Sequence, residues 1–302
     1  MNKYESIYDF AVNNNCRANF DEPMSKHTSF KIGGSASLFV TPSDDDALIN
    51  LLEKCAQENV RTYILGNGSN ILVSDEGIDA VVISMCRDED QIQVSDDGIV
   101  SCSAGVSLMK VCRTALKNSL SGLEFAYGIP GSVGGAVYMN AGAYGGEIKD
   151  VIVSCKAVSR DGVVTEFKKE DMLLGYRTSV FNSNDYIILS AKFRLIADNP
   201  DNIKSRMDDF MNRRKTKQPL EYPSAGSVFK RPEGYFAGAL IEECGLKGKR
   251  IGGAEVSVKH SGFIINVGSA TADDVMKLVE FVKETVKKEK GVELEPEIRI
   301  VR

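Results

Sequence analysis

Two glycine-rich segments of the sequence have the composition of loops that bind phosphate through backbone N–H groups. The first glycine loop, residues 65–73, reads LGNGSNILV, with two glycines, a hydroxyl and two side-chain amides between apolar residues. Such a composition exposes successive N–H groups, which together bind anions. The third glycine and the following helix of a Rossmann dinucleotide fingerprint are both missing. Taken alone, this segment favours a tight hairpin in which Asn and Gly accept positive φ angles.

The second glycine loop, residues 127–136, changes that interpretation. It reads YGIPGSVGGA and holds four glycines within residues 128–135. Small residues let a ligand touch the backbone, and Gly134 and Gly135 open a predicted short helix with unpaired N–H groups and a positive dipole end. Close helix packing without a ligand is the alternative. The two loops together predict a phosphate cradle made of Gly66, Asn67, Gly68, Ser69, Asn70, Gly128, Ile129, Pro130, Gly131, Ser132, Gly134 and Gly135.

Further motifs extend the pattern over nearly the whole chain. In order, the motifs are residues 27–34 (HTSFKIGG), 65–70 (LGNGSN), 128–135 (GIPGSVGG), 175–179 (GYRTS), 225–230 (AGSVFK) and 295–299 (EPEIR). This order resembles the UDP-N-acetylenolpyruvoylglucosamine reductase family of bacterial peptidoglycan synthesis. The two glycine loops alone resemble an FAD domain of the vanillyl-alcohol-oxidase, or PCMH, type. The resemblance implies noncovalently bound FAD as the cofactor and NADPH as a co-substrate.

The reaction that the resemblance implies has two halves. NADPH reduces FAD, and the reduced flavin passes hydride to the enolpyruvyl double bond of UDP-N-acetylglucosamine enolpyruvate, which yields UDP-N-acetylmuramate. Addition at the terminal carbon leaves negative charge on the adjacent carbon, delocalised into the carboxylate. The protein should therefore supply an electrophile for that charge and an acid that delivers a proton.

Three residues match the family's catalytic positions. Arg177, in the GYRTS motif, could grip the substrate carboxylate with its planar guanidinium as charge accumulates there. Ser227, in AGSVFK, matches the proton donor, and Glu297, in EPEIR, matches a carboxyl group that partners the enolate-like intermediate. Without the motifs, these residues are interpreted as a surface cation, a turn serine and an exposed carboxylate on the last strand, where Glu293 and Glu295 share its face.

Three further residues are assigned to the substrate by the same resemblance. Tyr176 precedes the catalytic arginine, and Lys217, in KQP, matches a family lysine whose charge suits the UDP diphosphate. Arg231 stands where some members of the family carry Asn, so a cation replaces an amide. The span between the GYRTS motif and the next predicted helix is too short for the tyrosine-bearing loop that closes over the substrate in one subclass. The chain therefore resembles the loop-lacking type.

Two rival functions stay open at this point. A sugar or lactone oxidase of the same flavin fold would often attach flavin covalently through His or Cys near the phosphate loops, whereas residues 66–73 contain neither. A flavin-binding or UDP-sugar-binding module that has lost its chemistry is the second rival. Against this module stands the joint presence of Arg177, Ser227 and Glu297.

The elements that must position these residues alternate between short β-rich runs and amphipathic helices. We expect strands at residues 38–41, 62–65, 80–84, 91–94, 98–103, 151–159, 163–168, 186–195 and 262–267. The runs 151–159, 163–168 and 186–195 look like an antiparallel set, in which the turn Arg160-Asp161-Gly162 joins the first two. We expect helices at residues 44–59, with Ser43 as N-cap, and at 106–118, 198–217, 236–244 and 272–289. The apolar residues of the first helix that recur at helical spacing are Ala47, Leu48, Leu51, Leu52 and Cys55. A break at residues 197–202 separates a two-part, PCMH-type FAD-binding domain, 1–200 with a split near residue 100, from an α+β substrate-binding domain, 201–302. The predicted class is therefore α+β.

The bulk composition excludes several classes of protein. A chain of 302 residues with 43% hydrophobic and 26% charged residues is globular, and its length favours two domains. A net charge of −5 without a basic stripe argues against a nucleic-acid partner. The seven cysteines include no Cys-x-x-Cys pair, which favours reduced thiols. The sequence has only two histidines and no cysteine spacing that would replace them as ligands, so we expect no metal site. Without a signal peptide or an apolar run of membrane length, we expect a cytoplasmic monomer that does not insert into a membrane.

Overall fold

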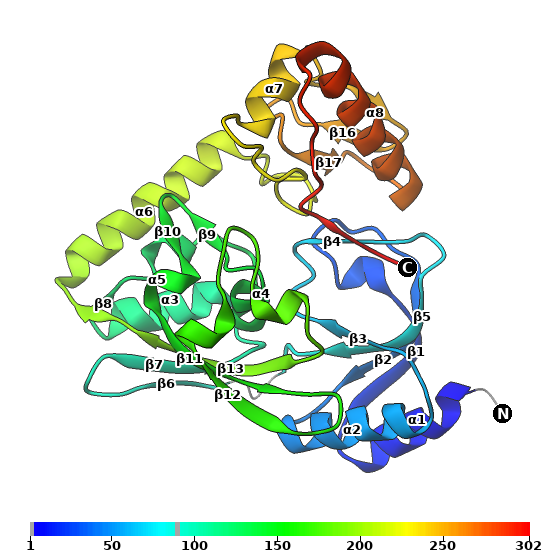
Figure 1. Ribbon diagram of the computed structural model, residues 1–302, viewed down its shortest axis with the longest axis vertical. Helices are drawn as coiled ribbons and strands as arrows, with labels where there is room; N and C mark the ends of the chain where they lie inside the picture. The colour runs from blue at the N-terminus through cyan, green and yellow to red at the C-terminus, as the bar shows by residue number, and fades with distance from the viewer. Residues whose placement is uncertain (1–2, 88–90) are drawn as a thin grey trace. The chain divides into compact units, whose positions relative to one another are not determined.

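The computed structural model describes residues 3–87 and 91–302, and these form two compact units (Figure 1). The first unit comprises Met1–Phe20, Ser37–Asn67 and Ala80–Asn212, and the second comprises Asp21–Ala36, Gly68–Asp79 and Arg213–Arg302. The change of unit at residues 212–213 falls inside one long helix, later than the break expected at residues 197–202. The assignment of FAD to residues 1–200 and of substrate to residues 201–302 stays a prediction.

The first unit holds most of the secondary structure. Its helices are α1 (Lys3–Asn13), α2 (Asp45–Gln57), α3 (Leu108–Lys117), α4 (Val133–Tyr138), α5 (Ile148–Val151) and the greater part of α6 (Pro200–Lys217). Its 3-10 turns are η2 (Glu124–Ala126), η3 (Lys169–Met172) and η4 (Val180–Asn182). Its complete strands are β3 (Thr62–Leu65), β6 (Ile92–Val94), β7 (Ile99–Ser103), β8 (Leu120–Ser121), β9 (Gly142–Ala143), β10 (Gly146–Glu147), β11 (Ile152–Val158), β12 (Val164–Lys168), β13 (Ile187–Arg194) and β14 (Ile196–Ala197). It also holds the greater part of β1 (Arg17–Pro23), β2 (Ser35–Thr41) and β5 (Ile78–Ser84).

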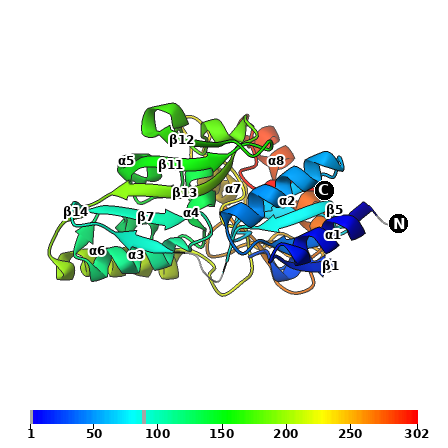
Figure 2. The same cartoon turned by 90° about the horizontal axis from the view of Figure 1, so that it is seen from below.

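Two sheets form the framework of the first unit. One has the strand order β1-β2-β5-β3, with β3 and β5 parallel. The other has the order β12-β11-β13-β7-β6 and is antiparallel throughout, which confirms the antiparallel set expected between residues 151 and 195 (Figure 2). One hydrophobic core joins α2 to both sheets, with Leu38, Leu48, Val81, Val100 and Phe193 fully buried. Phe125 of η2 and Val133 of α4, which flank the second glycine loop, are buried in the same core.

The second unit is smaller and combines segments from both ends of the chain. It contains η1 (Met24–Lys26), β4 (Ile71–Val73), α7 (Ala237–Glu243), β15 (Arg250–Ile251), β16 (Ala254–Val256), β17 (Ile264–Asn266), α8 (Ala272–Lys290) and β18 (Arg299–Val301). Strands β15, β16 and β17 form an antiparallel sheet beside α8 (Figure 1). Phe30, Leu72, Val228 and Val282 share one buried core, so the two N-terminal segments are integral to this unit.

Local sequence signals set the ends of α2, with one correction. The helix buries all five apolar residues predicted to face the core, which are Ala47, Leu48, Leu51, Leu52 and Cys55. Its N-cap is Asp44 and not the predicted Ser43, because the Asp44 carboxylate accepts a hydrogen bond from the N–H of Ala47 at 2.7 Å. Strand β3 occupies the expected residues 62–65, and the other expected helices and strands are present with shifted ends. The elements that were not predicted are α1, β1, α5, β8, β9, β10, β14, β15 and β16.

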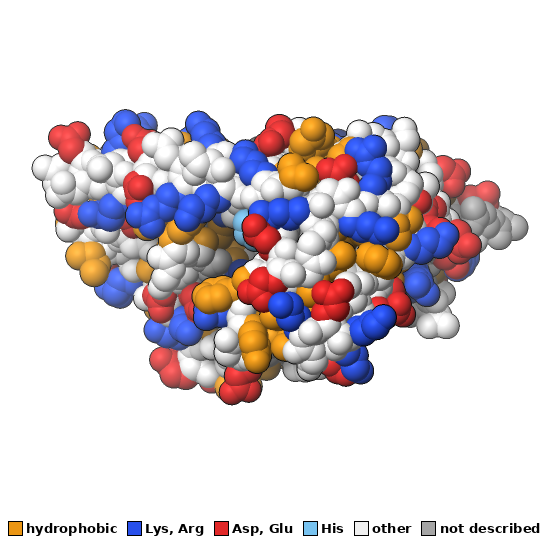
Figure 3. Space-filling model, turned by 90° about the horizontal axis from the view of Figure 1, so that it is seen from above, with side chains coloured by type: hydrophobic (Ala, Val, Ile, Leu, Met, Phe, Trp, Pro, Cys, Tyr) orange, Lys and Arg blue, Asp and Glu red, His pale blue; other side chains and the backbone are white. Residues whose placement is uncertain are grey.

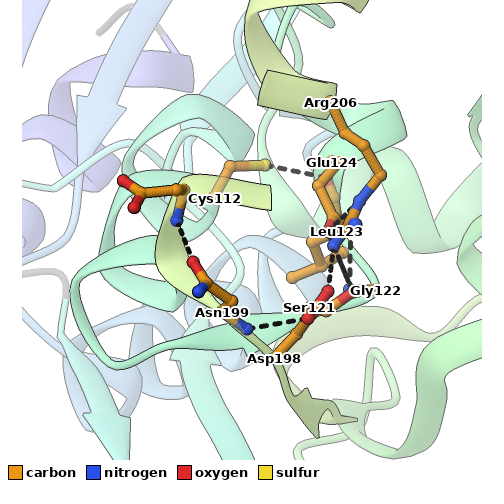
Figure 4. Close-up of polar contacts among 9 residues, drawn as sticks. Cys112, Ser121, Gly122, Leu123, Glu124, Asp198, Asn199 and Arg206 are labelled. Atoms are coloured by element: carbon orange, nitrogen blue, oxygen red, sulfur yellow. Dashed lines mark hydrogen bonds and ion pairs between the residues drawn. The ribbon is translucent and has the colours of Figure 1, made fainter. Parts of the chain in front are cut away.

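An ion pair between the buried Glu124 and the partly exposed Arg206 ties α6 to η2, just ahead of the second glycine loop (Figure 4). Glu124, whose side chain is 8% exposed, accepts hydrogen bonds from Arg206 at 2.8 Å, from the Ser121 hydroxyl at 2.9 Å and from the Gly122 N–H at 2.7 Å. Arg206 also pairs with Asp198 at 2.5 Å. Burial raises the pKa of Glu124, but these hydrogen bonds outweigh it and hold the pKa below its usual value.

The surface carries charges of both signs. On the face drawn in Figure 3, acidic and basic side chains are intermixed. Arg214, Lys215 and Lys217 occupy the last turn of α6, where cations are favoured by the helix dipole. Within residues 3–87 and 91–302, no helix combines the length and the apolar character needed to cross a membrane.

Replacing Arg206 by Met should lower the free energy of unfolding by roughly 1–3 kcal/mol, because the Glu124 carboxylate would stay buried without its cation. Since the folded pKa of Glu124 is depressed, its contribution is present above the unfolded pKa of about 4.3 and is lost as the pH falls through the folded value. Urea unfolding at decreasing pH should therefore show the difference between parent and variant shrinking below about pH 4.

Lys204→Ala is the matched control on the same helix. It breaks an exposed pair with Asp208 and should change stability by less than about 0.5 kcal/mol. Equal stability of parent and Arg206→Met at neutral pH would contradict a stabilising role for the ion pair between Arg206 and Glu124.

Candidate active site

The first glycine loop joins strands of two different sheets. It connects β3, which ends at Leu65, to β4, which begins at Ile71. Strand β3 pairs with β5, and β4 pairs with β18, both in parallel. The hairpin interpretation is therefore wrong, because the two flanking strands belong to separate sheets.

The two glycine loops lie against each other in the first unit. The Nδ2 group of Asn67 donates to the Pro130 carbonyl at 3.2 Å. A Cβ atom on Gly66 would lie 2.5 Å from the Ser132 hydroxyl oxygen, too close for any residue other than glycine without a shift of that oxygen. This arrangement fits a dinucleotide diphosphate, because small residues on two adjoining segments leave the backbone within reach of a ligand.

Gly134 and Gly135 do not offer the unpaired N–H groups that the sequence predicted. The N–H of Gly134 donates to the Ala104 carbonyl at 2.8 Å, and that of Gly135 donates to the Ser132 hydroxyl at 3.4 Å. A Cβ atom on Gly134 would lie 2.9 Å from the Cβ of Ala104, so this glycine serves close packing. The packing alternative is therefore right for Gly134, and residues 128–132 stay the predicted ligand contacts of this loop.

The second half of the first glycine loop belongs to the second unit. Gly68 has a φ of +59°, and a Cβ atom there would overlap the carbonyl oxygen of His27. The N–H of Ser29 donates to the Gly68 carbonyl at 3.1 Å, and Ser69, the next residue, is half-buried. The HTSFKIGG motif therefore supports the glycine loop through main-chain contacts.

Arg177 occupies the corner of a tight turn in the first unit. Gly175 and Thr178 exchange backbone hydrogen bonds of 3.0 and 3.3 Å, which leaves Tyr176 and Arg177 at the corner. Arg177 has a φ of +55°, a left-handed conformation that costs a non-glycine residue roughly 1–2 kcal/mol. Its two terminal guanidinium nitrogens both donate to the Gly142 carbonyl at 3.4 Å. Backbone strain of this kind is frequent at functional sites.

Ser227 and Glu297 come from distant parts of the chain but lie on neighbouring backbone segments of the second unit. Ser227 forms a β-bridge with Phe263, and the N–H of Glu297 donates to the Val228 carbonyl at 2.7 Å. Both Ser227 and Glu297 are half-buried. Strand β18 begins only at Arg299, so the prediction that Glu297 lies on the last strand is wrong.

Asn70 links the first glycine loop to the segment that carries Glu297. Its Nδ2 group donates to the Glu297 carbonyl at 3.3 Å, and its own carbonyl accepts from the Arg299 N–H at 3.0 Å. Asn70 therefore fixes the main chain on both sides of Ile298. The two motifs are more than two hundred residues apart, so spacing along the sequence gave no sign of this contact.

The structure separates Glu297 from the two neighbouring glutamates. Glu293 and Glu295 are both exposed and form ion pairs with Lys287 and Lys230. These pairs occupy solvated positions and contribute little to stability or chemistry. Glu297 is the half-buried carboxylate of the three, in agreement with the motif.

His260 lies beside Ser227, although no motif predicted it. A Cβ atom on Gly262 would lie 3.3 Å from Ser227 Oγ and 3.0 Å from Cε1 of His260. The Nδ1 atom of His260 accepts a hydrogen bond from the Gly262 N–H at 3.1 Å, which places the proton of the neutral ring on Nε2. Burial lowers the pKa of His260, so the ring is neutral near pH 7.

The predicted substrate residues are distributed over both units. Tyr176 is 52% exposed in the first unit, and Lys217 is exposed at the end of α6. Arg231 lies in the second unit, with its guanidinium carbon 4.0 Å from the ring centre of Phe236. Its Nε donates to the Tyr235 carbonyl at 3.3 Å, so the cation is stacked on an exposed aromatic ring.

The chain matches two protein-family models. Residues 36–168 match the FAD binding domain, and residues 218–301 match the C-terminal domain of UDP-N-acetylenolpyruvoylglucosamine reductase. The reductase of that name from Clostridium botulinum (strain 657 / Type Ba4) is 52% identical over 305 aligned residues, covering 100% of this chain and 98% of the relative. The chain belongs to the UDP-N-acetylenolpyruvoylglucosamine reductase family. A further relative, from Syntrophomonas wolfei subsp. wolfei, is 48% identical and covers 99% of each chain.

Solved structures agree with membership of this reductase family. The UDP-N-acetylenolpyruvylglucosamine reductase from Thermus caldophilus has a TM-score of 0.80 at 34% identity, covering 95% of this chain and 99% of that chain. The BBE-like 1 protein from Physcomitrella patens has a TM-score of 0.50 at 16% identity over 63% of this chain, which shows a likeness of fold alone. The predicted α+β class with a PCMH-type FAD-binding domain is confirmed.

Replacing Gly66 by Ala should push the glycine loops apart, because the added methyl group would lie 2.5 Å from Ser132 Oγ. We expect the free energy of unfolding to fall by roughly 1–3 kcal/mol and FAD to bind more weakly. Urea unfolding and titration of flavin fluorescence measure the two effects. Adding Ser132→Ala, which removes the obstructing oxygen, should restore part of the lost stability.

Gly135→Ala is the matched control for this experiment. Its methyl group would lie 3.4 Å from the same hydroxyl oxygen, which is an ordinary contact. Stability should stay within about 1 kcal/mol of the parent. If the two glycine variants lost stability equally, the contact between Gly66 and Ser132 would not be what holds the loops.

Proposed function

We propose that this chain catalyses the NADPH-dependent reduction of UDP-N-acetylglucosamine enolpyruvate to UDP-N-acetylmuramate with FAD as the cofactor. The observation that carries the proposal is 52% identity over the whole chain to a reductase of that name. The FAD-binding-domain match over residues 36–168 supports the flavin. The motif residues Arg177, Ser227 and Glu297 are all present, which argues against a binding module that has lost its chemistry.

The two glycine loops supply the residues that would hold FAD. These are residues 66–70 and 128–132, with Gly134 and Gly135 shaping the second loop from behind. The side chains of Asn67 and Asn70 already bond to Pro130 and Glu297, so backbone groups are the proposed phosphate contacts. When FAD is bound, it provides hydride transfer from NADPH to the enolpyruvyl double bond.

Arg177 is proposed to stabilise the negative charge that develops on the substrate carboxylate. A guanidinium can donate two parallel hydrogen bonds to a carboxylate, and such charge-assisted bonds are among the strongest in proteins. Its nitrogens meet the Gly142 carbonyl at the long distance of 3.4 Å, so a carboxylate would compete well for them. Tyr176, exposed at the same corner, is the proposed neighbouring substrate contact.

Ser227 is proposed to deliver a proton to the carbon next to the site of hydride addition. The O–H bond breaks, the C–H bond forms, and the serine oxygen then regains a proton from solvent. A serine hydroxyl is a weak acid, so this transfer requires a strongly basic carbon and a fixed orientation. The β-bridge with Phe263 and the hydrogen bond from the N–H of the next residue, Val228, to the Gly262 carbonyl at 2.8 Å fix the main chain of Ser227.

Glu297 is proposed to act beside Ser227 as a hydrogen-bonding partner of the enolate-like intermediate. Its main chain is fixed by Val228 on one side and by Asn70 on the other. Lys217 and Arg231 are proposed to contact the UDP diphosphate, where point charges favour phosphate oxygens. The family resemblance supports the assignment of Lys217, whose exposure leaves it accessible to a ligand, whereas Arg231 stands where some members of the family carry Asn.

Covalent attachment of the flavin through Cys86 is a specific alternative. Its Sγ donates to Oδ1 of Asn67 at 3.1 Å, although residues 66–73 themselves contain neither Cys nor His. We propose noncovalent binding, in which case acid precipitation should leave the yellow colour in the supernatant.

All seven cysteines lie in the described part of the chain, where none forms a disulfide. This supports our proposal of a cytoplasmic enzyme, which we further propose acts as a monomer.

The purified protein should contain FAD and should oxidise NADPH only when UDP-N-acetylglucosamine enolpyruvate is supplied. Absorbance at the NADPH band follows the reaction, and chromatography of the product should show UDP-N-acetylmuramate in a one-to-one ratio with the NADPH consumed. Steady NADPH oxidation without this substrate would indicate an oxidase. FAD-loaded protein that does not turn over this substrate would contradict the proposed function.

A further inference from the structure

Asn140 is a buried amide that connects the end of α4 to the turn that carries Arg177. It is 1% exposed, follows the C-cap residue of α4 and has a φ of +41°. Its Nδ2 group donates to the Gly175 carbonyl and to Glu147 Oε2, each at 2.9 Å, and its Oδ1 accepts from the Lys149 N–H at 2.9 Å. Both donor hydrogens and the acceptor are used, which fixes the direction in which the amide faces.

The contact with Gly175 bears directly on Arg177. Gly175 is the first residue of the turn in which Arg177 adopts its left-handed conformation. A carbonyl that is fixed at this position restrains the corner from which the guanidinium extends. The guanidinium itself meets the carbonyl of Gly142, two residues after Asn140. The short segment 140–142 therefore anchors both the turn and the side chain of Arg177.

Glu147 supplies the negative charge in this cluster. It pairs with Lys149 at 2.8 Å, and its second partner is the Nδ2 group of Asn140. The hydrogen bond from Lys149 lowers the pKa of Glu147, and the bond from Asn140 and the positive charge of Arg177 act in the same direction. An anionic carboxylate accepts from the amide more strongly than a neutral oxygen does, so it holds the Asn140 side chain in place.

We propose that Asn140 is a positioning residue that holds Arg177 in its reactive orientation, an inference that rests on the proposed role of Arg177. Helix α4 begins in the second glycine loop and ends next to Asn140, so one short element connects the cofactor loop to the arginine. Without the amide donor, the strained turn could relax. A displacement of about 1 Å at a catalytic group can slow a reaction on the order of 10²-fold.

Asn140→Asp tests the proposal because it keeps the size of the side chain and the acceptor for Lys149 but removes the donor to Gly175 and Glu147. We expect kcat to fall by about 10- to 100-fold, with KM changed much less, because positioning acts on the transition state. The content of bound flavin and the rate of its reduction by NADPH should match the parent. Asn140→Ser, which introduces no charge, is the second variant and should show the same pattern.

Asn182→Asp, at the end of η4 in the loop that follows the turn of Arg177, is the matched control. Oδ1 of Asn182 only accepts hydrogen bonds, from the Ser179 N–H at 2.8 Å and from the Ser179 hydroxyl at 3.1 Å. A carboxylate accepts both equally well, so this variant should turn over like the parent. A loss of kcat in Asn182→Asp that equalled the loss in Asn140→Asp would show that any added charge in the loop has this effect, and would overturn the proposal.

A double-mutant cycle with Arg177→Ala shows whether Asn140 acts through the arginine. In that background Asn140→Asp should cost nothing further, because the group that it positions is gone. Three outcomes would each overturn the positioning role and leave the proposed function intact. They are an equal loss of kcat from Asn140→Asp in both backgrounds, a parent-like kcat in Asn140→Asp, and a loss of kcat that is explained by a lower content of bound flavin. Normal turnover of Arg177→Ala would instead refute the role of Arg177, and the positioning role with it.

Discussion

Gly66 and Ser132 approach each other so closely that the first glycine loop has no room for a side chain at this point. At this close approach, the two loops are joined by the hydrogen bond from Asn67 to Pro130. Neither loop forms the proposed site alone, because each is a single turn between regular elements. Their approach creates adjoining stretches of backbone, and backbone groups are what a diphosphate requires. The cofactor site therefore depends on the absence of side chains as much as on the presence of donors.

Each glycine loop is also connected to a proposed catalytic residue. The second loop opens α4, which leads through Asn140 to the turn of Arg177. The first loop ends at Asn70, which bonds to the main chain of Glu297. In the proposed site, the same short elements would hold the cofactor and orient the groups that act on the substrate. Rigid support of this kind is what preorganised charge stabilisation needs.

The sequence predicts the structure well where the signals are local. The apolar spacing of α2 predicts all five of its buried core residues, and the Arg160-Asp161-Gly162 turn predicts the pairing of β11 with β12. Contacts between distant segments are not predictable in this way. The pairing of β4 with β18, the packing of Gly134 on Ala104 and the burial of Phe30 in the second core depend on residues far apart in the chain. For the same reason the composition of the first loop suggested a hairpin.

The residues of the candidate site likewise fall into those that local sequence predicts and those that only the fold reveals. Motif resemblance identifies Arg177, Ser227 and Glu297, because each motif is a short continuous stretch. Asn140 and Asn70, which bond to the main chain of two of these motifs, carry no local signature and emerge only from contacts in the folded chain. The same is true of His260, which lies near Gly262, as Ser227 does. A side chain that acts through a partner 35 residues away leaves no periodic or compositional trace.

The central claim is that the glycine loops hold the cofactor while Ser227 acts only on the substrate. Stopped-flow absorbance of Ser227→Ala tests it most directly, because the flavin band follows reduction by NADPH and reoxidation by substrate as separate phases. We predict that reduction proceeds at the parent rate and that product formation slows by at least about 10²-fold. Slow reduction of the flavin by NADPH in this variant, or product formation at the parent rate, would contradict the account.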